Sequence, residues 1–167
     1  MLKIREVEHS IADLVKSCNG YCPCAVEHDE DTKCMCKEFR ESDKPGLCHC
    51  GRFEKYEVPD FIEYHGQKVS TDDRVIIVDR PDRHKEYVMY MPGLDEIVVI
   101  DDSWSFNGDA KCPTFFPSIL TEFGGNLNKR NHCFITKGKI QYLSDCSHKY
   151  KNSIRDIPPI RDWPDFV

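Results

Sequence analysis

Alternating hydrophobic and polar positions dominate the chain after residue 56. Short apolar-rich runs, separated by charged residues or by Pro and Gly, predict three strands at 74–78, 86–91 and 96–100. Two further runs, 134–136 and 139–143, flank Lys137 and Gly138, a two-residue connection typical of a β-hairpin. We therefore expect a mainly antiparallel β domain over residues 57–167.

The hydrophobic pattern before residue 56 is different and favours helices. Apolar residues recur at helical spacing over 4–17, and Asn19 and Gly20 follow as a stop signal. A second segment, 31–40, begins with capping residues and predicts a helix that would carry Cys34 and Cys36 on its first turn. The fold class expected is α+β, with a small helical cysteine-rich domain at 1–56.

Composition narrows the class of protein. The chain has 167 residues, 40% of them hydrophobic, and a formal net charge of −6, which excludes a disordered tail or a large multidomain enzyme. No stripe of Lys and Arg appears, so nucleic acid is not an expected partner. No signal peptide or membrane-spanning run is recognisable, so we expect no membrane association and a location in the cytoplasm.

Cysteine is the unusual residue of this chain. Seven of the ten cysteines lie between residues 18 and 50, and six of these form Cys-x-Cys pairs at 22/24, 34/36 and 48/50. Four thiolates complete one zinc site or one [4Fe-4S] cluster, which leaves two cysteines able to form a disulfide. The one-residue spacers disfavour zinc, which usually takes longer spacers between paired ligands, but zinc stays open.

The segments 21–24 (Tyr-Cys-Pro-Cys) and 48–51 (Cys-His-Cys-Gly) resemble the catalytic subunit of ferredoxin:thioredoxin reductase. This resemblance implies a [4Fe-4S] cluster and a redox-active disulfide between Cys24 and Cys50. The cluster ligands implied are Cys22, Cys34, Cys36 and Cys48.

The same resemblance implies an iron-sulfur disulfide reductase. A ferredoxin-like donor would supply electrons, and a thioredoxin- or glutaredoxin-like protein would be reduced. Cys50 would lie beside the cluster, Cys24 would attack the target disulfide, and His49 would serve in acid/base chemistry.

The β-rich remainder resembles a small uncharacterised domain family common in phages, through the segments 104–109, 112–120, 132–134 and 145–148. No activity comes with this resemblance, which is compatible with a phage-encoded protein in the host cytoplasm. A zinc site stays open among five residues, Cys112, Cys133, Cys146, His132 and His148. The alternative to the reductase is a non-enzymatic phage interaction module whose cysteines bind zinc or a structural cluster.

Overall fold

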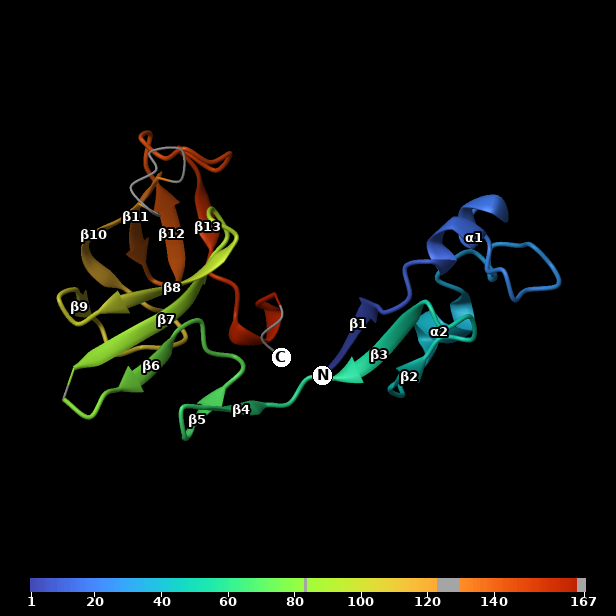
Figure 1. Cartoon of the computed structure of the whole chain (residues 1–167), viewed down its shortest axis with the longest axis horizontal. Helices are drawn as coiled ribbons and strands as arrows, with labels where there is room; N and C mark the ends of the chain where they lie inside the picture. Colours follow the sequence, from blue (N-terminus) through green and yellow to red (C-terminus); the bar gives the residue numbers. More distant parts are fainter. Residues whose placement is uncertain (83, 123–129, 165–167) are drawn as a thin grey trace. The chain divides into compact units, whose positions relative to one another are not determined.

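The computed structural model describes residues 1–82, 84–122 and 130–164. The chain forms two compact units, Met1–Pro59 and Asp60–Val167, which Figure 1 shows in blue to cyan and in green to red. The sequence pattern placed the division between residues 56 and 57.

The first unit is a small antiparallel sheet with two short helices. Its strand order is β1-β3-β2, with β1 at Leu2–Glu6, β3 at Phe53–Glu57 and β2 at Gly46–Leu47. Helix α1 spans Ile11–Ser17 and helix α2 spans Lys37–Glu41. The buried ammonium of Lys55 donates hydrogen bonds to the carbonyl oxygens of Arg40 and Ser42 at 2.9 and 2.5 Å, which ties the end of α2 to β3.

The prediction of a helix over 4–17 is wrong in its first half. Residues Leu2–Glu6 form strand β1, in which Ile4 lies opposite Lys55, and α1 begins only at Ile11. Ile4 and Val7 match helical spacing but are exposed, so no buried helix face uses that spacing. Hydrogen bonds to β3, a partner about fifty residues away, decide the conformation instead.

The second predicted helix is also misplaced. Helix α2 begins at Lys37, so Cys34 lies before the helix, and Cys36 is its extended N-cap residue with φ −66° and ψ 156°. In the described ranges the α-helices are these two short segments, and strands make up most of the regular structure. The α+β prediction with a helical iron-sulfur segment is therefore wrong, although its antiparallel β domain is present.

The described residues of the second unit form antiparallel strands in three sheets (Figure 1). A two-stranded sheet pairs β4 (Phe61–Tyr64) with β5 (Gln67–Ser70). A three-stranded sheet has the order β6-β7-β8, formed by Ile76–Asp79, Lys85–Met91 and Glu96–Asp101. The largest sheet has the order β13-β12-β11-β10-β9, formed by Ile154–Asp156, Lys139–Tyr142, Arg130–Thr136, Phe115–Glu122 and Ser105–Phe106.

The strands predicted near 74–78, 86–91 and 96–100 are confirmed as β6, β7 and β8. The predicted hairpin is also confirmed, since Thr136 pairs with Lys139 across the turn. Lys137 and Gly138 both have positive φ, 50° and 73°, as a two-residue turn between twisted strands requires.

The five-stranded sheet has one buried and one exposed face. Ile119, Cys133, Ile135, Ile140 and Tyr142 point into the core and are at most 3% exposed. The residues between them point outward, because successive side chains of a strand alternate between faces. This outward face carries the candidate site.

No helix in the described part of the chain is long and apolar enough to cross a membrane.

Candidate active site

Ser118 lies in an irregular part of β10. Phe115 pairs with Ile135 and Ile119 pairs with Cys133, so four steps along β10 correspond to two steps along β11. The extra residues form a bulge that includes Pro117, and bulges of this kind re-aim side chains next to functional sites. The indole nitrogen of Trp104 donates a hydrogen bond to the Ser118 carbonyl oxygen at 3.2 Å, which anchors the bulge.

His132 extends from the outward face of β11, the strand next to β10. Its Nε2 atom lies 3.1 Å from the hydroxyl oxygen of Ser118. Its Nδ1 atom lies 2.9 Å from a carboxylate oxygen of Asp145. One imidazole therefore connects a hydroxyl and a carboxylate that come from separate segments of the chain.

A turn after β12 places Asp145 beside His132. The buried thiol of Cys146 accepts a hydrogen bond from the His132 amide at 3.3 Å and donates one to its carbonyl at 3.1 Å. The amide and the hydroxyl of Ser147 both donate hydrogen bonds to the Arg130 carbonyl oxygen, and the Arg130 amide donates one to the Ser147 hydroxyl oxygen. These bonds hold the two residues that follow Asp145 against β11.

The partners fix the tautomer of His132. An ionised carboxylate only accepts hydrogen bonds, so Nδ1 carries the hydrogen that faces Asp145. Nε2 is then free to accept the hydroxyl hydrogen of Ser118. This is the arrangement in which a histidine acts as general base toward a serine nucleophile.

The surroundings keep Asp145 ionised. The hydrogen bond from His132 lowers the pKa of the Asp145 carboxyl below its ordinary value, and the charge of Arg130 acts in the same direction. The Nη2 atom of Arg130 lies 3.1 Å from Asp145, and its Nη1 atom lies 3.4 Å from Glu122. Arg130 and His132 therefore contact the same carboxylate oxygen of Asp145.

A second histidine–aspartate pair on the same unit makes a useful comparison. His84 Nδ1 lies 3.1 Å from Asp102, but the His84 side chain is 66% exposed. His132 is only 25% exposed and its second nitrogen meets a serine hydroxyl. The serine partner and the partial burial distinguish His132 from an ordinary surface ion pair.

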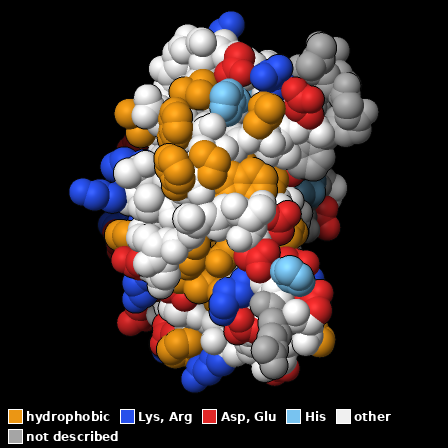
Figure 2. All heavy atoms as spheres, turned by 90° about the vertical axis from the view of Figure 1, so that its left-hand side faces the viewer, with side chains coloured by type: hydrophobic (Ala, Val, Ile, Leu, Met, Phe, Trp, Pro, Cys, Tyr) orange, Lys and Arg blue, Asp and Glu red, His pale blue; other side chains and the backbone are white. Residues whose placement is uncertain are grey.

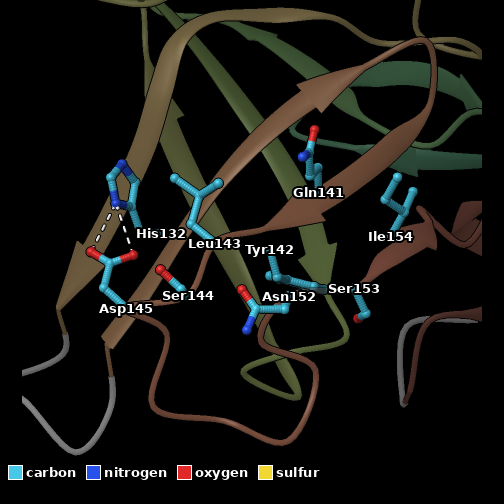
Figure 3. A pocket seen from close by; sticks show the side chains of 9 residues that line it. All are labelled: His132, Gln141, Tyr142, Leu143, Ser144, Asp145, Asn152, Ser153 and Ile154. Carbon is cyan, nitrogen blue, oxygen red and sulfur yellow. Dashed lines mark hydrogen bonds and ion pairs between the residues drawn. The ribbon is translucent and has the colours of Figure 1, made fainter.

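A groove of about 550 Å³ begins at His132 and Asp145 (Figure 3). It passes over β12 toward the start of β13, and Gln141, Leu143, Asn152 and Ile154 are among its lining residues. Exposed apolar side chains of Phe116, Leu120 and Phe134 lie on β10 and β11 around the serine and histidine. Figure 2, which views the second unit from the side where β9 and β10 lie, shows hydrophobic side chains gathered across that surface.

The cysteines predicted to form a redox site lie in the first unit. Cys22, Cys34, Cys36, Cys48 and Cys50 line one small cavity together with His49, whereas Cys24 is exposed and lines a different pocket. The Cys48 and Cys50 sulfurs are 3.5 Å apart, and the Phe53 amide donates to the Cys48 sulfur at 3.1 Å. All ten cysteines are free in the structure, and the redox-active Cys24–Cys50 disulfide stays a prediction.

The predicted metal-binding, iron-sulfur character is wrong for the described residues. No group of three or more His, Cys, Asp or Glu side chains among them is arranged to hold a metal ion. Burial raises the pKa of the Cys50 thiol to about 12 and also raises the pKa of the Cys22 thiol. The cofactor at Cys22, Cys34, Cys36 and Cys48 stays a prediction, and we derive no chemistry through a cluster or a zinc ion.

The zinc site considered in the β domain is also wrong, because its residues have other partners. His132 faces Ser118 and Asp145, and Cys146 bonds with the backbone of His132. His148 Nε2 lies 3.1 Å from the side-chain oxygen of Asn131.

The predicted electron donor, the thioredoxin-like acceptor and the redox roles of Cys24, Cys50 and His49 stay predictions that no observation here tests.

Ser118, His132 and Asp145 were not predicted from the sequence as one site. All three lie in the segments 112–120, 132–134 and 145–148 noted above, but His132 was considered there only as a candidate zinc ligand. The usable signal was a serine, a histidine and an aspartate in three separate segments of one β domain, each next to a strand. Their proximity depends on strand order and on the bulge, which the local pattern does not show.

Comparison with known proteins gives a partial match to a protein family. The chain is similar, over residues 61–143, to a family model described as bacterial ubiquitination-like system serine protease (BubE). This match covers just under half of the chain, includes Ser118 and His132, and ends shortly before Asp145. No curated protein and no solved structure matches the chain.

Proposed function

We propose that the second unit is a serine hydrolase that cleaves an amide bond, with Ser118 as nucleophile, His132 as general base and acid, and Asp145 as the group that orients His132. The observation that carries the proposal is the continuous contact from Ser118 through His132 to Asp145, at 3.1 and 2.9 Å. The similarity to a serine protease family supports the choice of an amide as substrate.

The chemistry follows from these contacts. The hydroxyl oxygen of Ser118 attacks the substrate carbonyl carbon while its proton passes to His132 Nε2. His132 then gives that proton to the leaving nitrogen as the carbon–nitrogen bond breaks, which leaves an acyl group on Ser118. Water attacks this ester with His132 again as base, so the net reaction is hydrolysis. Asp145 stays ionised throughout and stabilises the imidazolium.

The substrate proposed is a protein of a ubiquitination-like system, because the family description names such a system. The open, exposed setting of the site suits a polypeptide chain better than a small enclosed ligand. We further propose a cytoplasmic location, since ten free thiols suit a reducing compartment.

Two measurements on the whole chain test the chemistry and the substrate separately. In the first, 4-nitrophenyl acetate should give a burst of nitrophenolate that is absent from Ser118→Ala and kept by Ser105→Ala, an exposed serine on β9. A burst that survives in Ser118→Ala would contradict the assigned nucleophile.

In the second, mass spectrometry follows a ubiquitin-like modifier that carries a few extra residues at its C-terminus. The wild-type protein should shorten it and Ser118→Ala should not. A normal burst without cleavage of the modifier would support the proposed hydrolase chemistry but contradict the proposed ubiquitin-like substrate.

A further inference from the structure

We propose that the groove running from His132 to Ile154 binds the part of the substrate that leaves with the amine, and that it selects uncharged, apolar residues there. This inference rests on the proposed function and adds to it a substrate class on one side of the cleaved bond.

The side of the bond follows from the strand order. Ser118 lies on β10 and His132 on the neighbouring strand β11. The groove continues over β12 to β13, the strands farther from β10 in the sheet order, and Figure 3 shows its lining residues. In acyl transfer the histidine gives its proton to the leaving nitrogen, so the leaving group lies on the histidine side of the serine. A chain attached to that nitrogen therefore enters the groove.

The selectivity follows from the lining. Leu143 and Ile154 are apolar, and Gln141, Ser144, Asn152 and Ser153 are polar but uncharged. Among the described residues, the lining includes no Lys or Arg, and its one carboxylate, Asp145, is already paired with His132 and Arg130. A charged side chain entering here would lose water without gaining an opposite charge, whereas an apolar one would cover Leu143 and Ile154.

Transfer of the acyl group from Ser118 to an added amine tests this inference directly. This step is the reverse of amide cleavage, so the attacking amine binds where the leaving amine binds. 4-Nitrophenyl acetate acetylates Ser118 and releases nitrophenolate. The acetyl group then passes either to water, giving acetate, or to the amino group of a dipeptide amide, giving an N-acetyl dipeptide. In the second case His132 takes the proton of the amine. The ratio of the two products reports how well the dipeptide occupies the groove.

At equal concentrations, Leu-Leu amide should give a ratio about tenfold higher than Glu-Glu amide. Ile154→Asp should lower the ratio for Leu-Leu amide about fivefold, because it replaces exposed apolar surface of the groove by a charge. Val99→Asp is the matched control, since Val99 is an equally exposed aliphatic residue on β8, outside the groove lining, and should leave the ratio unchanged.

Equal ratios for the two dipeptides, or an unchanged ratio in Ile154→Asp, would overturn the inference. Absence of acetylation at Ser118 is a different result, because it would overturn the proposed function on which the inference rests.

Discussion

Asp145 decides which nitrogen of His132 carries the hydrogen, because its carboxylate lies 2.9 Å from Nδ1 and only accepts. Replacing Asp145 by Asn offers an amide group that can donate to Nδ1 and so favours the wrong tautomer. We expect Asp145→Asn to lower kcat for ester or peptide hydrolysis by about 10⁴-fold with little change in folding. Asp156→Asn, which breaks an exposed pair with Lys139, should change kcat less than about twofold. Similar effects of the two variants would contradict the role of Asp145.

Arg130 acts on the reaction only through Asp145. Removing its charge in Arg130→Met should raise the pKa of the Asp145 carboxyl, since the Arg130 charge helps to lower it. Carbon-13 NMR titration of the carboxyl measures this shift, and we expect a several-fold loss of kcat to accompany it. Arg130→Lys keeps the positive charge and should restore much of the lowered Asp145 pKa and much of kcat. An unchanged titration of Asp145 in Arg130→Met would show that Arg130 is merely structural.

At the scale of an element, the turn after β12 depends on a neutral histidine. His148 Nε2 faces the side-chain oxygen of Asn131 at 3.1 Å, and its Nδ1 faces the Tyr150 amide at 3.3 Å. The first nitrogen therefore donates and the second accepts, which only the neutral ring allows. Burial accordingly lowers the pKa of His148 below its ordinary value.

This lowered pKa predicts how stability changes with pH. Below about pH 6.5 the unfolded chain binds a proton at His148 while the folded chain does not, so the free energy of unfolding falls as pH falls. The loss continues until the pH reaches the lowered folded pKa. Denaturant unfolding between pH 7 and pH 5 should show this decline, and it should be smaller in His148→Gln. An equal decline in both proteins would show that His148 does not cause the loss of stability at low pH.

Some elements of the fold could be predicted from the sequence, and others could not. Strands β6, β7 and β8 and the turn at Lys137 and Gly138 depend on local alternation and on positive φ, which are visible in a short window. Strand β1 was predicted as a helix because its partner β3 is distant in sequence. Ser118 and His132 meet only through the register of β10 and β11 and the bulge between them. Long-range pairing of this kind leaves no periodic signal.

At the scale of the whole molecule, the site belongs to the second unit alone. Ser118, His132, Asp145 and Arg130 all lie within Asp60–Val167, and the hydrophobic core around them runs from Val69 to Trp163. We expect a chain of residues 60–167 to fold and to keep the burst with 4-nitrophenyl acetate. Circular dichroism and the burst amplitude measure both. A truncated chain that unfolds, or folds without a burst, would show that residues 1–59 contribute to the site.

The most direct test of the central claim is covalent labelling of the whole protein with a fluorophosphonate, followed by mass spectrometry of its peptides. Such reagents react with a serine that a neighbouring base activates. The account predicts one adduct per chain, on Ser118, which is lost in Ser118→Ala and strongly slowed in His132→Ala. No adduct, or an adduct on another serine that forms equally fast in His132→Ala, would contradict it.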